Sequence, residues 1–132
     1  MLSVINKVNA RLEQKLKSDP DAPYHDKTLH FTSESSNVPR EFPTLSVVSL
    51  GEPTITSDLT MTVQAGIWST VEIKAYSDTA LYDATNLLDK AGDVMLSMGY
   101  NLIYGQATLS DVIPFCKVAR FRRAVGSGDF LY

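Results

Sequence analysis

The sequence predicts an α+β fold, in which an antiparallel sheet of about four strands carries an N-terminal helix and one long central helix packed on it. Two segments repeat apolar residues every three or four positions, as helices do, and other segments alternate apolar and polar residues, as strands do. These segments follow one another as helix, long loop, strand, strand, helix, strand and strand. The 132 residues, of which 44% are hydrophobic and 20% charged, suit a single globular domain spanning residues 1–132.

The first predicted helix runs from about Leu2 to Ser18 and is amphipathic. Pro20 ends it, because the residue before a proline is pushed out of helical geometry. Its apolar stripe is narrow, so we expect the helix to lie on a sheet or a neighbour rather than inside a core. The stripe consists of Ile5, Val8, Leu12 and Leu16.

Residues 19–41 are mostly polar and lack a regular pattern, which is unusual for so long a stretch inside a compact domain. We expect a mobile loop that becomes ordered against a partner, with His25, His30 and Phe31 among the residues in contact. A short strand around Thr28–Thr32 would make part of this loop a protruding hairpin.

Two strands are predicted before the central helix. Phe42–Leu50 is rich in β-branched residues and is closed by Gly51 and Pro53. A second extended stretch begins near Leu59 and is clearest at Ile67–Tyr76, where a period of two is typical of a half-buried antiparallel strand. The residues that face one way are Val71, Ile73 and Ala75, and those that face the other way are Thr70, Glu72, Lys74 and Tyr76.

The central helix has the clearest pattern in the chain. Ser77 or Asp78 can cap its N-terminus, since a short side-chain oxygen accepts hydrogen bonds from the free N–H groups of the first turn. Gly99 follows its last apolar residue, where a left-handed C-terminal cap is expected. The apolar face comprises Leu81, Ala84, Leu87, Leu88, Ala91, Val94, Met95 and Met98.

Two more strands are predicted after this helix, at Tyr100–Thr108 and Phe115–Val125. Tyr104 and Gly105 are expected to form a bulge or a turn. Residues 126–132 are interpreted as a flexible tail, because glycines open it, although apolar side chains end it.

No catalytic, cofactor-binding or metal-binding site is predicted. His25 and His30 lie five residues apart in the polar loop, whereas helical metal ligands usually lie four apart, and we interpret both as solvated side chains. Cys116 falls in a predicted strand with no predicted base nearby, which favours a buried structural cysteine over a nucleophile. As the one cysteine of the chain, it also excludes an internal disulfide.

Charge and hydropathy argue against two further classes of protein. Twelve Lys and Arg against fifteen Asp and Glu give a net charge of −3, whereas a protein held to nucleic acid by bulk positive charge needs a surplus of cations. No apolar run approaches the roughly 20 residues that span a bilayer, and the N-terminus has lysines among its apolar residues, unlike a signal peptide. We therefore expect a soluble, non-membrane protein of the cytoplasm, or one assembled there into something larger.

A cluster of cations in the last predicted strand is the most informative group. Arg120 and Arg122 share one face with Val118, so this face is apolar at one end and cationic at the other. Three interpretations are open: sequence-independent contact with DNA, pairing with carboxylates of a neighbouring subunit, and a solvated strand whose charges discourage unwanted pairing. The whole cluster is Lys117, Arg120, Arg122 and Arg123, and the carboxylates on the polar side of the central helix are Asp78, Asp83, Asp89 and Asp93.

The segment VEIKAYSDTALYDATNLLDKAGDVMLSMGYNLIYG, followed by FCKVARFRRAV, resembles the tail terminator, or tail-completion, proteins of long-tailed (siphovirus-type) bacteriophages. The shared features are a strand that ends in Tyr76-Ser77, a long Ala/Leu-rich helix that runs into Met98-Gly99-Tyr100, and a strand that ends in Arg122-Arg123. FPTLSVVSLGE is similar to an earlier strand and turn of that family. The resemblance covers roughly Phe42–Val125, and residues 19–41 have no counterpart in it.

The resemblance implies a non-enzymatic, structural subunit of the virion that assembles in the host cytoplasm into a ring, typically a hexamer, at the head-proximal end of the tail. Such a ring stops polymerisation of the tail tube and joins the tail to the head. Its partners would be copies of itself, the tail tube protein and a head–tail connector protein, and DNA would only pass through its lumen. Capping requires one ring face to match the last tube ring and the other face not to match another.

Arginines of the last strand and carboxylates of the central helix are expected to make the subunit or lumen contacts. The closest alternative function is a head-side connector or stopper protein of the phage neck. An alternative from another class is a small cytoplasmic enzyme that uses one of the histidines with the cysteine. The residues expected in subunit or lumen contacts are Arg120, Arg122, Arg123, Asp83, Asp89 and Asp93.

Overall fold

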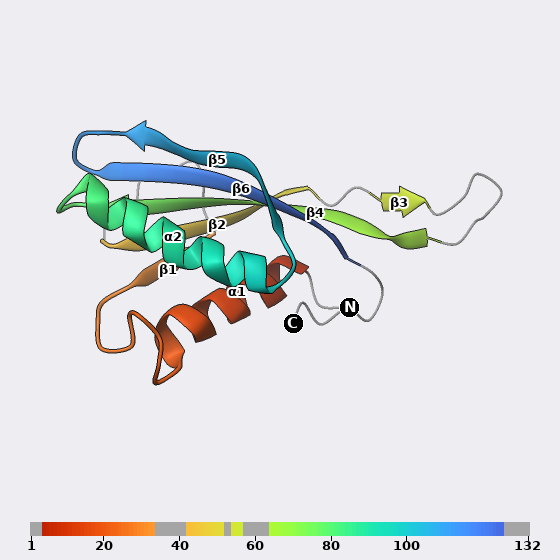
Figure 1. The fold of residues 1–132 in the computed structure, drawn as a ribbon, viewed down its shortest axis with the longest axis horizontal. Helices are drawn as coiled ribbons and strands as arrows, with labels where there is room; N and C mark the ends of the chain where they lie inside the picture. Colours follow the sequence, from red (N-terminus) through yellow and green to blue (C-terminus); the bar gives the residue numbers. More distant parts are fainter. Residues whose placement is uncertain (1–3, 34–41, 52–53, 57–63, 126–132) are drawn as a thin grey trace.

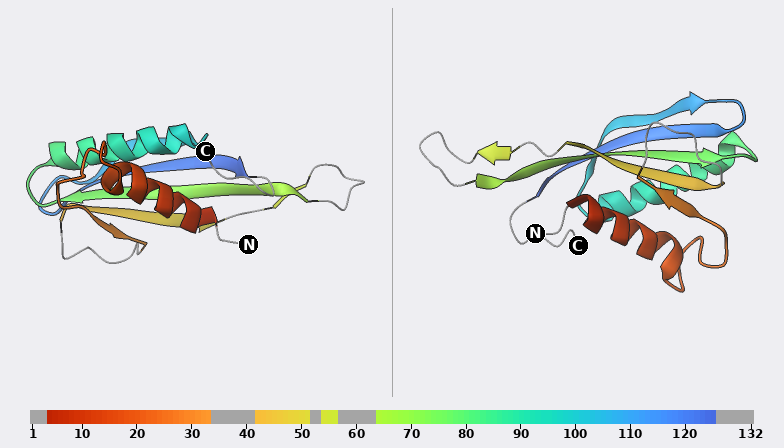
Figure 2. Two further views of the ribbon diagram at one scale, coloured as in Figure 1. Left: turned by 90° about the horizontal axis from the view of Figure 1, so that it is seen from below. Right: turned by 180° about the vertical axis from the view of Figure 1, so that it is seen from behind.

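The computed structural model describes residues 4–33, 42–51, 54–56 and 64–125. The elements are α1 (Val4–Glu13), the π-helical turn η1 (Gln14–Ser18), β1 (His30–Thr32), β2 (Thr44–Gly51), β3 (Thr54–Thr56), β4 (Gln64–Ser77), α2 (Leu81–Ser97), β5 (Asn101–Ser110) and β6 (Phe115–Val125). The strands form one sheet in the order β1-β2-β4-β6-β5, and β3 pairs with β4 outside this path. Helix α2 covers one face of the sheet and α1 lies beside it along β2 (Figure 1, Figure 2).

The predicted α+β class, with an N-terminal helix and a longer central helix, is confirmed, but the predicted sheet of about four antiparallel strands is wrong. The path through the described sheet has five strands, and it is mixed because β1 runs parallel to β2. His30 pairs with Thr44 and Thr32 pairs with Ser46, so both strands run in the same direction. A strand of three residues is too short to show an alternation, and alternation carries no information about direction.

Strand β4 lies between β2 and β6 and is antiparallel to both. The predicted alternation is confirmed, since Val71, Ile73 and Ala75 are fully buried in the core beneath the helices. The other face of β4 is more buried than the prediction of a half-buried strand implies, because Glu72 and Tyr76 are only 8% and 6% exposed. This second face carries the charged side chains considered below.

The N-terminal helix is confirmed over the described residues, although its last turn is π-helical. Val4 joins the buried stripe, whereas Ile5 is only partly buried. The helix ends at Asp19, which is extended with ψ 145°, as expected for a residue before a proline. The stripe packs against α2 and the sheet, so the helix contributes directly to the core.

Helix α2 has the predicted C-terminal cap but not the predicted N-terminal one. Gly99 has φ 85°, and its N–H donates to the carbonyl of Leu96 while the N–H of Tyr100 donates to that of Met95, which is the Schellman pattern. At the other end the N-cap residue is Ala80, whose side chain makes no capping hydrogen bond. The prediction of Ser77 or Asp78 as the cap was wrong because the helix starts at Leu81, three residues after Asp78.

The described part of the polar loop contacts the rest of the chain. Leu29 is 4% exposed and belongs to the core, and Tyr24 and Phe31 pack partly buried against it. The predicted short strand is confirmed as β1, but it lies at the edge of the sheet beside β2 and is not part of a protruding hairpin. Residues 34–41 lie outside the described residues, as do residues 126–132 of the predicted tail. Mobility of the loop stays a prediction.

Strand β5 is the second edge of the sheet and pairs irregularly with β6. The register shifts at three places along the pair, one of them between Tyr104 and Ala107, where a bulge or turn is predicted. Tyr100, just before β5, is buried, and its hydroxyl lies 2.7 Å from Ser69 Oγ of β4. This buried hydrogen bond ties the beginning of β5 to the central strand.

Candidate functional site

The face of the sheet that points away from α2 carries the candidate site, here called the charged face. It is formed by alternate residues of β4 and β6, because Val71 and Ile73 point into the core and the residues between them point away. The antiparallel register sets Glu72 opposite Arg120 and Thr70 opposite Arg122. The residues of the charged face are Trp68, Glu72, Lys74, Tyr104, Arg120 and Arg122.

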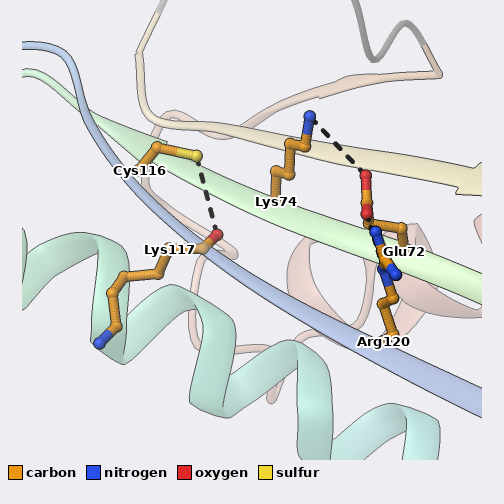
Figure 3. A network of polar contacts seen from close by, with 5 residues as sticks. All are labelled: Glu72, Lys74, Cys116, Lys117 and Arg120. Carbon is orange, nitrogen blue, oxygen red and sulfur yellow. Dashed lines mark hydrogen bonds and ion pairs between the residues drawn. The ribbon is translucent and has the colours of Figure 1, made fainter. Parts of the chain in front are cut away.

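Glu72 is the centre of an ion network on this face (Figure 3). Arg120 Nε donates a hydrogen bond of 2.9 Å to Glu72 Oε2, and Lys74 Nζ lies 3.7 Å from Glu72 Oε1. The side chains of Glu72 and Lys74 are 10% and 15% exposed, whereas that of Arg120 is 46% exposed. Since one carboxylate oxygen accepts a hydrogen bond from Arg120 and the other faces Lys74, Glu72 is suited to fixing Arg120 in place.

Both arginines of the charged face also lie over aromatic rings. The guanidinium carbon of Arg120 is 5.5 Å from the centre of the Tyr104 ring, and that of Arg122 is 4.8 Å from the Trp68 ring. Such contacts hold a guanidinium in one orientation through the attraction between a cation and the face of a π-system. Arg120 and Arg122 are exposed, so they present oriented donors to whatever covers this face.

A hollow of about 410 Å³ lies on the charged face above the ion network. Its volume falls within the usual range for small-molecule sites, but its charged groups pair with one another. The residues that line it are Glu72, Lys74, Tyr104, Leu109, Val118 and Arg120. This arrangement favours contact with a macromolecule over binding and turnover of a small substrate.

Cys116 lies on the same face but is 2% exposed, and its thiol lies 3.8 Å from the carbonyl oxygen of Lys117 and close to the Tyr76 hydroxyl. Burial raises the pKa of this thiol, and burial followed by the nearby Cys116 and Glu72 raises the pKa of Tyr76 from 10.0 to about 12. Both groups are therefore neutral at physiological pH. The thiolate that nucleophilic catalysis requires is not available here.

The two histidines lie between η1 and β2 in the chain. His25 follows η1, and its Nδ1 lies 3.3 Å from the carbonyl oxygen of Lys17. His30 is on β1, which β2 and β4 separate from the β6 strand of Cys116, and three strand spacings amount to roughly 14 Å. No histidine–cysteine pair is formed by His30. Within the described ranges, no group of three or more His, Cys, Asp or Glu side chains could hold a metal ion, and no helix is long and apolar enough to cross a membrane.

The six residues predicted to make subunit contacts fall into separate groups. Arg120 and Arg122 are together on the charged face, whereas Arg123 lies on the helix side of the sheet. A Cβ placed on Gly99 would be 3.0 Å from Arg123 Nε, so this arginine packs over the end of α2. Side chains alternate between the two faces of a strand, so Arg120 and Arg122, two residues apart, share one face and Arg123 points to the other.

The three carboxylates predicted in subunit contacts are all exposed on α2, on the opposite side of the subunit from the charged face, whereas Asp78, predicted on the same helix, precedes it. Asp83 accepts a hydrogen bond from Thr79, and Asp89 accepts one from Gln106 of β5. Asp93 is exposed on the same helix. Within one subunit these carboxylates therefore do not meet the arginines of the charged face.

Sequence reasoning missed four members of the charged face: Glu72 and Lys74, which form the ion network with Arg120, and Trp68 and Tyr104, whose rings lie beneath the arginines. Alternation in both strands was visible, but the register that sets Glu72 opposite Arg120 was not. An opposite-charge pair across adjacent antiparallel strands is a signal that could have found it.

Comparison with known proteins finds no match: no family model fits the chain, and no curated protein sequence is significantly similar to it.

Proposed function

We propose that this chain is a subunit of a phage tail terminator, a ring that caps the head-proximal end of the tail tube and joins the tail to the head. The proposal is supported by the resemblance over residues 42–125 and by the distribution of charge on the subunit. It describes a structural role, in which the charged face contacts a protein and does not process a substrate.

The observation that carries the proposal is that exposed arginines and exposed carboxylates lie on opposite sides of one subunit. Arg120 and Arg122 are on the charged face, and Asp89 and Asp93 are on the outer side of α2. A ring needs two different complementary surfaces on each subunit, because each copy contacts the next one head to tail. Opposite charges on the two surfaces fix the orientation of such a contact more than they strengthen it.

The arginines are also prepared for this role before assembly. Glu72 and the Tyr104 ring hold Arg120, and the Trp68 ring supports Arg122, so less side-chain freedom is lost when a neighbour binds. Arg122 is the better candidate for a contact between subunits, since Arg120 already hydrogen-bonds to Glu72 within its own chain.

Electron microscopy tests the proposal, using the purified protein alone and mixed with tubes of the tail tube protein from the same genome. We expect rings, and one ring bound at a single end of each tube. Arg122→Glu should give overlong or ragged tails while its circular dichroism spectrum stays that of the wild type. Glu13→Lys is the charge-reversal control, because Glu13 is exposed on α1 and lies outside the charged face, α2 and residues 19–41.

Two results would overturn the proposal. The first is a wild-type protein that never binds tail tubes and is absent from finished particles. The second is a protein that binds the head-side connector and leaves the tubes uncapped, which would favour the head-side stopper instead.

A further inference from the structure

Strand β5 is an edge strand that lacks the charges and prolines that usually protect edges. Its only neighbour in the described sheet is β6, so its outer backbone groups face away from the sheet. None of its ten residues, NLIYGQATLS, is charged, and none is proline. Edge strands of native proteins usually carry charges or proline that prevent pairing with other chains, unless something covers them.

Large apolar side chains are exposed along β5 and the turn that follows it. At 150–250 Å² for a large side chain, exposures of 48% to 68% leave roughly 600 Å² of this group accessible. These side chains are distributed over both faces of the edge, since Leu102 pairs with the core-facing Phe121 and Tyr104 pairs with Arg120 of the charged face. Their summed area approaches the 800 Å² or so that each partner buries in a stable interface. The group, here called the β5 strip, comprises Leu102, Ile103, Tyr104, Leu109, Val112 and Ile113.

The backbone of β5 favours contact through these side chains over a long added strand. The three register shifts against β6 interrupt the regular ladder, and bulges of this kind twist an edge away from continuous pairing. The apolar side chains are therefore the part of the edge that a partner would bury.

Charges of opposite sign flank the β5 strip. On the charged face, Arg120 lies against the ring of Tyr104, and on the helix side Asp89 accepts a hydrogen bond from Gln106. A partner that carries charge of only one sign, such as nucleic acid or a basic peptide, would complement one flank of the strip and be repelled by the other. A second copy has both signs in the same arrangement, so the charged face of one chain can meet the α2 side of the next.

We infer that the β5 strip is the apolar centre of the contact between two copies of this chain. The inference rests on the proposed function in that it takes the neighbour in the ring to be the partner. In this arrangement the strip supplies the buried apolar area, and the arginines and carboxylates beside it set the orientation of the two copies.

Sedimentation velocity of the full chain, from micromolar to near-millimolar concentration, tests this inference. Ile103→Asp and Val112→Asp each place a carboxylate in the strip, and we expect each to weaken self-association roughly 100-fold, because an unpaired charge would have to be buried. Ala10→Asp is the matched control, because Ala10 is exposed on α1, outside the strip, the charged face and α2, and it should associate like the wild type. Hydrogen exchange of the wild type should show residues 101–113 more protected in the concentrated sample than in the dilute one.

The outcomes separate this inference from the proposed function. Self-association that both strip variants leave unchanged, or no added protection of residues 101–113, would overturn the inference and leave the ring proposal standing. A wild type that stays monomeric at every concentration would also overturn the inference. Loss of association in the strip variants, with a wild type that does not cap tail tubes, would support the inference and contradict the terminator function.

Discussion

Removing the carboxylate of Glu72 should destabilise the fold more than removing the arginine that it binds. In Glu72→Ala, Lys74 loses an ion pair of 3.7 Å while its side chain is only 15% exposed, and Arg120 loses a hydrogen bond of 2.9 Å. Breaking a buried ion pair from one side costs about 3–5 kcal/mol, and we expect about 3 here because Arg120 is 46% exposed and can be solvated.

Arg120→Ala should cost less, about 1 kcal/mol, because Lys74 still faces the carboxylate of Glu72. At an effective dielectric constant of about 20, two charges 3.7 Å apart attract by about 4 kcal/mol before desolvation is subtracted, which is enough to hold the remaining pair together. Lys74 keeps its ion pair with Glu72 when Arg120 is replaced and loses this ion pair when Glu72 is replaced. The two single variants therefore differ in stability.

Urea unfolding of the wild type, Glu72→Ala and Arg120→Ala measures these costs, and a double-mutant cycle with Glu72→Gln and Arg120→Gln measures the coupling between the two side chains. We expect a coupling energy of about 1 kcal/mol that falls as salt is added. The reasoning is refuted if Glu72→Ala is no more destabilising than Arg120→Ala, or if the coupling is absent at low salt.

Three further results are expected. Gly99→Ala should cost about 1–2 kcal/mol in urea unfolding because φ is 85° there, while Gly105→Ala, with nothing within 4 Å of the added Cβ, should stay within about 0.5 kcal/mol. Melting temperature should fall as pH rises from about 9 toward 12, because the pKa values of Cys116 and Tyr76 are raised and the unfolded chain ionises first; Tyr76→Phe should flatten this fall. Hydrogen exchange should show the amides of residues 29–32 protected even in the dilute protein, since Leu29 is in the core and β1 pairs with β2.

Periodicity predicted the parts of the fold that long segments determine. Helix α2 has enough residues for its pattern to be unambiguous, and every residue of its predicted apolar face except Leu81 is buried. Gly99 was predictable as a cap for the same reason, because it directly follows a long apolar stripe. A long element repeats its apolar period several times, so one residue that departs from the period does not change the prediction.

The missed features depend on contacts between segments that are distant in sequence. Leu29 lies in a polar stretch, and its burial follows from the position of β1 beside β2. The pairing of Glu72 with Arg120 spans 48 residues and requires the register of β4 and β6. Neither composition nor periodicity predicts the register between two strands. The arginines were therefore predicted as a group, and Glu72, which orients Arg120, was not.

The position of each arginine on β6 decides what its replacement would test. Phe121 points into the core, so its neighbours Arg120 and Arg122 must point to the charged face, and Arg123 must return to the helix side over Gly99. Changing Arg123 would disturb packing at the end of α2, and changing Arg120 would disturb the ion network around Glu72. Arg122 contacts the exposed ring of Trp68 and lies outside both of these arrangements. Of the three predicted arginines, Arg122 is therefore the one whose charge reversal separates a defect in assembly from a defect in folding.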